Sequence, residues 1–175
     1  MVKSATRDIL HLVSANVQGL RDREKRARFK EWTLQQKANI VFIQESHFTA
    51  DIMSAVTRDF HNWHTCHSFG TSSSRGCSIF IHESVDFKVI KSIEDENGRF
   101  ILLNTEVSDN QFTLINIYAN NEMKYRNRFI KKLSSLIESE AVGIKLLGGD
   151  FNDTLTTSDR ITNSKKLTLT IITPI

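Results

Sequence analysis

Short apolar runs, separated by polar or glycine-containing stretches, recur along the chain and predict a series of β-strands. The Asn97-Gly98 pair between two of these runs is a strong signal for a hairpin turn. The expected strands cover residues 9–16, 40–43, 63–68, 77–82, 87–93, 100–107, 112–118 and 144–147.

Three segments between the strands predict helices. Residues 21–36 contain no helix breaker, with Leu20, Ala27 and Trp32 as expected apolar anchors, and residues 49–60 predict a short second helix. Residues 125–137 place apolar side chains on one stripe at helical spacing. The resulting order is strand, helix, strand, helix, a meander of strands, helix, strand. Two sheets with helices outside would bury such elements well.

Composition indicates an ordinary soluble globular domain. The chain has 175 residues, 39% of them hydrophobic and 25% charged, which suits one domain with a real core. A net charge of +3 is compatible with nucleic acid but not diagnostic of it. Cys66 and Cys77 have no metal-site spacing, so we expect free thiols. No apolar run approaches membrane-spanning length and no signal-peptide pattern is present, so we expect an intracellular protein, nuclear or cytoplasmic, without a membrane partner.

The stretch Gly148-Gly149-Asp150-Phe151-Asn152 follows the last predicted strand. In an extended backbone Asp150 and Asn152 would share one face, and Phe151 would point back into the core. A carboxylate beside an amide at the mouth of a sheet suits a phosphate and a hard cation. An Asx turn that closes an ordinary strand is the structural alternative.

Polar residues also follow other predicted strands, namely Asn16, Glu45 and Tyr118. Each alone is more often a cap or rim residue than a ligand, but their recurrence at strand ends favours a shared site. Mg²⁺ and Mn²⁺ prefer a few carboxylate and amide oxygens completed by water and substrate phosphate. The residues therefore favour a site for Mg²⁺ or Mn²⁺. The sequence contains no His/Cys cluster that would indicate zinc.

Five motifs resemble, in the same order, those of the endonuclease/exonuclease/phosphatase superfamily. The greatest similarity is to the AP-endonuclease-like domain of LINE-type non-LTR retrotransposons. The motifs are Ser-Ala-Asn16-Val-Gln-Gly-Leu, Phe-Ile-Gln-Glu45-Ser-His, Ile-Asn-Ile-Tyr118-Ala-Asn, Gly-Gly-Asp150-Phe-Asn152 and Thr-Ser-Asp-Arg160.

The resemblance implies a four-layer α/β/β/α sandwich of two mixed sheets, similar to deoxyribonuclease I, and Mg²⁺-dependent DNA nicking. It implies that Glu45 is the principal metal ligand and that Asn16 lies near the metal or the scissile phosphate. The implied catalytic residues are Tyr118 at the phosphate, Asp150 at the attacking water, and Asn152 at either. The implied DNA contacts are His47 and Arg160. Residues 21–30 are rich in basic side chains, so Arg21 and Arg23 are further candidates for phosphate contacts.

The sequence departs from the family at its C-terminal end. Members of the family continue well past the Asp-Phe-Asn motif and supply another Asp and a final Ser-Asp-His. No histidine follows Asn152 here, and the end resembles nothing in the family. We therefore expect an incomplete domain over residues 1–160 that lacks its C-terminal elements, a divergent tail over 161–175, an exposed sheet edge, and impaired activity. In a full-length element, a reverse transcriptase domain would follow it, and we expect a monomer.

Two other interpretations remain open. A non-catalytic remnant of the same fold could keep metal and phosphate contacts and bind nucleic acid without turnover. A phosphatase or sphingomyelinase relative would keep the fold and change the substrate, but no membrane-docking loop or inositol-phosphate cluster supports it.

Overall fold

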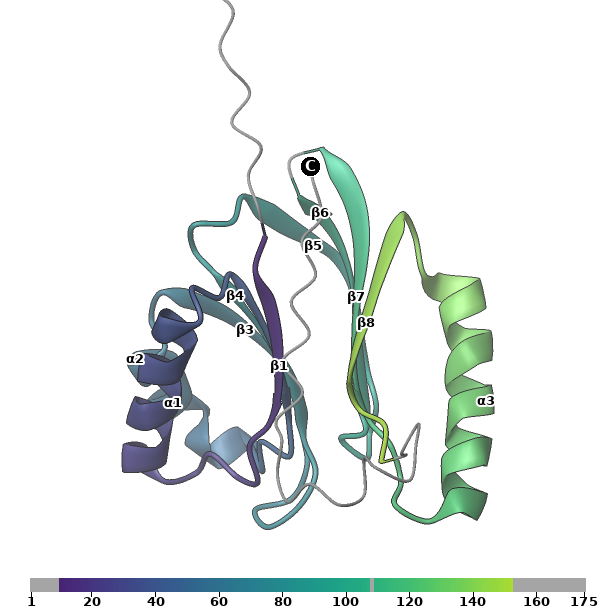
Figure 1. The fold of residues 1–175 in the computed structure, drawn as a ribbon, viewed down its shortest axis with the longest axis horizontal. Helices are drawn as coiled ribbons and strands as arrows, with labels where there is room; N and C mark the ends of the chain where they lie inside the picture. The colour runs from purple at the N-terminus through teal and green to yellow at the C-terminus, as the bar shows by residue number, and fades with distance from the viewer. Residues whose placement is uncertain (1–9, 108, 153–175) are drawn as a thin grey trace, which may run out of the picture.

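Two four-stranded sheets face each other and carry helices on their outer faces (Figure 1). The computed structural model describes residues 10–107 and 109–152. The predicted α/β/β/α sandwich of two mixed sheets is therefore confirmed. Arg160, the apolar run at 167–172 and the tail at 161–175 lie outside the described residues.

The first sheet has the strand order β1-β2-β4-β3. Its strands β1 and β2 are parallel and are connected through a helix, whereas β4 is antiparallel to both of its neighbours. Its elements are β1 (Leu12–Asn16), α1 (Arg23–Gln35), β2 (Ile40–Gln44), the 3₁₀ turn η1 (Ala50–Ile52), α2 (Met53–Asp59), β3 (Trp63–Ser68) and β4 (Cys77–His82).

The second sheet has the order β5-β6-β7-β8, with the first three strands antiparallel and β7 parallel to β8. Helix α3 forms the crossover between the two parallel strands. The elements are β5 (Phe87–Glu94), β6 (Phe100–Val107), β7 (Asn110–Tyr118), α3 (Met123–Glu140) and β8 (Ile144–Asp150).

The two parallel strand pairs, β1/β2 and β7/β8, determine where the polar side chains at the strand ends lie close together. Asn16 is paired in register with Gln44, and Tyr118 with Asp150, so both pairs of strands end level with one another. The carboxyl ends of parallel strands meet at one edge of a sheet, which is where ligands bind in open α/β sheets.

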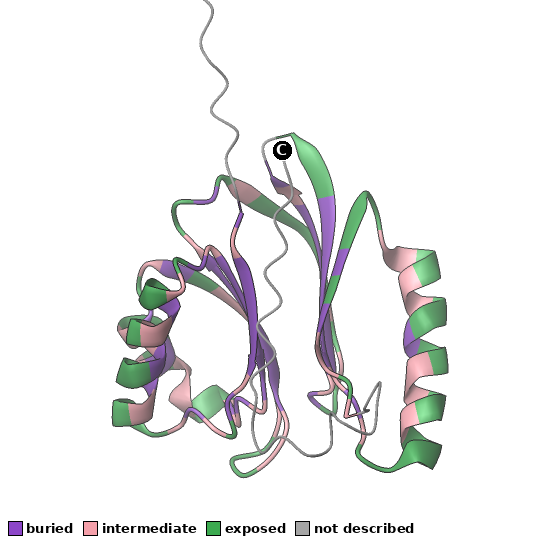
Figure 2. Cartoon of the chain, in the orientation of Figure 1, coloured by how far each residue is buried: buried purple, intermediate pink, exposed green. Residues whose placement is uncertain are grey.

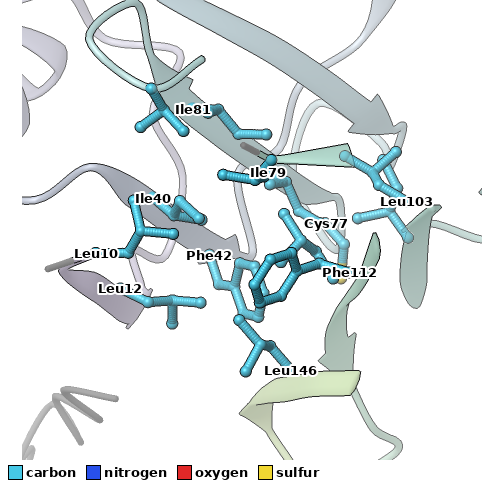
Figure 3. Close-up of a cluster of buried hydrophobic side chains, with 14 residues drawn as sticks. Leu10, Leu12, Ile40, Phe42, Cys77, Ile79, Ile81, Leu103, Phe112 and Leu146 are labelled. Atoms are coloured by element: carbon cyan, nitrogen blue, oxygen red, sulfur yellow. The ribbon is translucent and has the colours of Figure 1, made fainter. Parts of the chain in front are cut away.

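Three apolar clusters hold the four layers together. One lies between the sheets and includes Phe42, Ile79, Leu103 and Leu146 (Figure 3). A second packs the first sheet against α1 and α2, and a third packs the second sheet against α3. Strands β2, β4 and β6 are almost completely buried, whereas the edge strands β3 and β5 consist mainly of half-buried or exposed residues (Figure 2).

Helix α1 begins later than the sequence suggested because Asp22 caps it. The Asp22 Oδ1 accepts a hydrogen bond of 2.8 Å from the Lys25 backbone N–H. This capping bond sets the start of the helix after Asp22. Ala27, expected to be an apolar anchor, is exposed. The buried face is instead Arg26, Phe29 and Thr33, and Arg26 is accommodated because its Nε lies 2.7 Å from Asp59 Oδ2.

Strand β8 is less buried than its apolar sequence suggested. Leu146 and Gly148 face the core, but Ile144 and Leu147 are exposed. Gly148 allows close packing, since a Cβ there would lie 3.1 Å from the Phe42 ring. The expectation that Phe151 points into the core is wrong, because the strand ends at Asp150 and Phe151 remains 38% exposed.

No helix within residues 10–107 and 109–152 is long and apolar enough to cross a membrane. Cys66 and Cys77 are free thiols, as expected.

Candidate active site at the carboxyl ends of the strands

Asn16, from the end of β1, holds the side chains of Glu45 and Asp150 together. Its Nδ2 donates one hydrogen bond of 2.7 Å to Glu45 Oε1 and another of 2.8 Å to Asp150 Oδ2. The Gln18 backbone N–H donates to Asn16 Oδ1 at 3.1 Å, which fixes the orientation of the amide. Residues from both sheets thus form one cluster, as the sequence predicted for these three positions.

The loop that carries Glu45 has an unusual backbone. Glu45 and His47 have φ values of 52° and 56°, in the left-handed region that non-glycine residues seldom adopt. Hydrogen bonds from Gly19 N to Glu45 O (2.6 Å) and from Leu20 N to Ser46 O (2.9 Å) hold the loop against the segment after β1. Such strain costs about 1–3 kcal/mol per residue and persists where the surroundings enforce it, which is common at functional sites.

His47 packs beside Glu45. Its Nε2 lies 3.7 Å from Glu45 Oε2 and has no hydrogen-bond partner among the described residues, although it is buried. A Cβ on Gly19 would lie 2.7 Å from His47 Nδ1, so the glycine makes room for the ring. His47 therefore forms a wall of the carboxylate cluster.

The Asp150 motif forms the Asx turn that the sequence left open as the structural alternative. Asp150 Oδ1 accepts a hydrogen bond of 2.9 Å from the Asn152 backbone N–H, which is an Asx turn, while Oδ2 binds Asn16. The Asn152 side chain donates to Ala119 O at 2.7 Å. The turn therefore places Asp150 in the cluster and fixes Asn152 to the end of β7.

Tyr118 belongs to the same cluster. Burial, followed by a hydrogen bond to Glu45, raises the pKa of Tyr118 to about 12, so the phenol stays protonated at neutral pH. The Arg99 guanidinium lies 4.9 Å from the centre of the Tyr118 ring and donates to Ala119 O at 3.3 Å.

Arg99 and Arg126 are site neighbours that the sequence did not reveal. Arg126 Nη1 donates to Asn152 O at 2.7 Å, which supports the turn after β8. The only local signal for Arg99 is its place directly after the Asn97-Gly98 turn. Its position over Tyr118 depends on the pairing of β6 with β7, which is not encoded locally.

A buried polar network lies beneath the site and links the two sheets. Asn116 on β7 donates through Nδ2 to Ile43 O and Ser78 O, both at 2.8 Å. Gln44 on β2 donates to Asn116 Oδ1 at 2.6 Å and to Ser14 Oγ at 3.0 Å. Because Gln44 directly precedes Glu45, this network fixes the strand end that carries the cluster.

The basic run at 21–30 is largely engaged within the molecule. Arg21 pairs with Asp51 at 2.7 Å, and hydrogen bonds from Arg21 and Thr49 lower the pKa of Asp51 to about 2. The hydrogen bond from Arg26 likewise lowers the pKa of Asp59. Arg23, at the start of α1, is exposed.

The donor set suits a hard divalent cation. Two carboxylates converge on one amide, an arrangement of like charges that a bound cation would stabilise, and Mg²⁺ is commonly held by one or two carboxylates with waters. Among the described residues, no group of three or more His, Cys, Asp or Glu side chains is arranged to hold a metal. Asn16 turns its nitrogen toward both carboxylates, so it serves here as their hydrogen-bond donor.

Residues 13–168 match the model of the Endonuclease/Exonuclease/phosphatase family. The chain is also 25% identical over 158 residues to the 149 kDa protein of transposon TX1 from Xenopus laevis, covering 90% of this chain and 12% of that protein.

Solved structures share the fold. D. rerio TDP2 complexed with a single-strand DNA product aligns with a TM-score of 0.66 and 15% identity, covering 84% of this chain and 62% of that one. The endonuclease domain of TRAS1, a telomere-specific non-LTR retrotransposon, aligns with a TM-score of 0.63 and 15% identity, covering 85% and 63%. The chain thus spans less than two thirds of the length of these structures, and about an eighth of the transposon protein.

Proposed function

The chain belongs to the endonuclease/exonuclease/phosphatase family, and on that premise we propose that it is a Mg²⁺-dependent DNA endonuclease that hydrolyses phosphodiester bonds. The observation that carries the proposal is the Asn16 amide that binds both the Glu45 and Asp150 carboxylates, at 2.7 and 2.8 Å. The similarity to a transposon protein and to a retrotransposon endonuclease domain supports an origin in a non-LTR retrotransposon. In that setting the domain would act as a monomer within a larger element that also carries a reverse transcriptase.

Each side chain of the cluster has a distinct proposed role. Glu45 would be the principal ligand of Mg²⁺ or Mn²⁺, and Asn16 would keep the two carboxylates at their separation. When bound, the cation supplies charge stabilisation at the phosphoryl group and the leaving oxygen. Asp150 would orient the attacking water and accept its proton. The hydrogen bond from Asn16 fixes the position of this carboxylate.

The phosphate would be held by donors that stay protonated. Tyr118, with a pKa of about 12, would donate to a phosphate oxygen at neutral pH. The Asn152 amide would contact the phosphate or the water after exchanging its bond to Ala119. His47, Arg160, Arg21 and Arg23 are proposed as contacts to the DNA strand on either side, with Arg21 first giving up its bond to Asp51.

The substrate class can be tested by comparing three assays on one preparation. We expect nicking of supercoiled plasmid with Mg²⁺ or Mn²⁺, none with EDTA, and no release of nitrophenol from p-nitrophenyl phosphate. Plasmid binding in a gel shift without nicking in either metal would favour a non-catalytic nucleic-acid-binding protein. Efficient phosphomonoester hydrolysis without nicking would favour a phosphatase.

A further inference from the structure

A cavity of about 510 Å³ lies between α3 and the turn that connects β5 to β6. Its α3 wall extends from Phe129 to Ser139, which is ~15 Å at the rise of an α-helix. Phe100 and Leu136 contribute apolar surface. The volume lies in the range typical of sites for small organic ligands.

The rim of the cavity carries a surplus of positive charge. Arg75, Arg99 and Lys132 line it, and Asp95 is the acidic residue among its lining side chains. The Asp95 carboxylate is already engaged, because its Oδ2 accepts hydrogen bonds from the backbone N–H groups of Asn97 and Arg99. Three cationic side chains against one carboxylate leave the lining with a net positive charge, and within residues 10–107 and 109–152 none of the three cations forms an ion pair.

Two of these cations have weak contacts or none within the described part of the chain. Arg75 reaches Asn97 Oδ1 at 3.5 Å, the limit of a hydrogen bond, and Lys132 forms no ion pair or hydrogen bond there. Arg99 connects the cavity to the candidate active site, because its guanidinium lies over the Tyr118 ring. A strand that placed one phosphate at Tyr118 would have its neighbouring unit close to the cavity.

We propose that this cavity binds a nucleotide unit of the DNA strand next to the cleaved bond. The phosphate lies among Arg75, Arg99 and Lys132, and the base lies against the apolar surface of Phe129 and Leu136. A ligand with both an anionic group and a flat apolar ring matches both halves of the lining, as in other sites for single-stranded nucleic acid. The inference rests on the proposed function, since it assigns a subsite to the same substrate.

The test measures binding without metal, so that cleavage does not contribute. Deoxyadenosine monophosphate is titrated in EDTA into the full chain, with deoxyadenosine and inorganic phosphate as separate arms, while ¹H–¹⁵N shifts of α3 are followed. Lys132→Gln is expected to lower affinity for the nucleotide about tenfold, the loss of one charge-assisted hydrogen bond. Lys131→Gln is the matched control, because Lys131 is exposed on the same helix but does not line the cavity, and it should change affinity less than twofold.

A second measurement uses a short single-stranded oligonucleotide at increasing salt. Arg75→Gln and Lys132→Gln should each flatten the slope of log affinity against log salt by about 0.7, the value for one phosphate contact. Equal effects of Lys131→Gln and Lys132→Gln, or no shift of α3 with the nucleotide, would overturn the subsite. If the cavity fails these binding tests but the protein still nicks plasmid, the subsite is wrong and the proposed function stands. If the cavity binds the nucleotide but the protein does not nick plasmid, the proposed function is wrong and the binding site stands.

Discussion

Replacing Asn116 by Asp tests the polar network that links the two sheets. The substitution keeps the shape of the side chain but puts an oxygen where Nδ2 now donates to Ile43 O and Ser78 O, both at 2.8 Å. Asn116 is fully buried, so an ionised carboxylate there would face two carbonyl oxygens without solvent. The group would therefore stay protonated in the folded state, with a pKa raised far above its unfolded value.

The expected loss of stability follows from that protonation. Two donated hydrogen bonds become at most one, which costs ~1 kcal/mol. Holding an acid with an unfolded pKa of about 3.9 in its protonated form at pH 7 adds about 4 kcal/mol, at about 1.4 kcal/mol per pH unit. The total of ~5 kcal/mol is comparable to the whole stability of a marginal domain.

The sign of the pH dependence makes this prediction specific. A folded pKa above the unfolded value means that the penalty is small below the unfolded pKa and grows as pH rises. Urea unfolding of wild type and Asn116→Asp between pH 4 and pH 7 should show a difference of ~1 kcal/mol at the acid end that increases steadily. Asn121→Asp, at an exposed position, should stay within about 0.5 kcal/mol of wild type throughout. A difference below ~1 kcal/mol at pH 7, without pH dependence, would refute the role of the network.

Two further stability predictions use the same unfolding measurements. Gly149→Ala should cost more than ~2 kcal/mol, because Gly149 has a φ of 139° and a Cβ there would lie 2.0 Å from the backbone oxygen of Ile117. Gly148→Ala should cost less, because a Cβ there would lie 3.1 Å from the Phe42 side chain and the ring need shift by only a few tenths of an ångström. Equal melting temperatures of the two variants would contradict this prediction. Burial lowers the pKa of His67 from 6.5 to about 4, so the unfolded state binds more protons between these values and stability should fall as pH decreases from 6.5 toward 4. His67→Gln should remove that dependence, and an unchanged slope would show that other groups cause it.

Local sequence patterns predicted most of the helices and strands, because the ends of most of these elements are set by residues close by in the sequence. Strands β3, β4 and β6 have the predicted bounds, since each apolar run is closed by polar or glycine-containing turns. The exceptions depend on tertiary contacts. Arg26 can be buried because it forms an ion pair with Asp59 from α2. Phe151 is exposed because the chain turns at Asp150.

The candidate site was predictable at the level of residue identity but not of geometry. Polar residues at strand ends indicated Asn16, Glu45, Tyr118 and Asp150, and the parallel pairs β1/β2 and β7/β8 explain why they meet. Sequence alone could not show that the Asn16 nitrogen lies between the two carboxylates, because that depends on how the sheets face each other. It also gave no sign that Gln44 and Asn116 join the sheets below the site.

Cleavage of an end-labelled DNA duplex under single-turnover conditions shows whether the Asn16, Glu45 and Asp150 cluster is the active site. We expect Mg²⁺-dependent cleavage whose rate, however low in wild type, falls about 10²–10³-fold in Asp150→Asn, the loss of one preorganised group at the reacting centre. Glu45→Gln should lose cleavage similarly and should require more Mg²⁺, while Lys131→Gln should match wild type. Cleavage that continues at the wild-type rate in both Glu45→Gln and Asp150→Asn, with all samples folded, would contradict the assignment of this cluster as the active site.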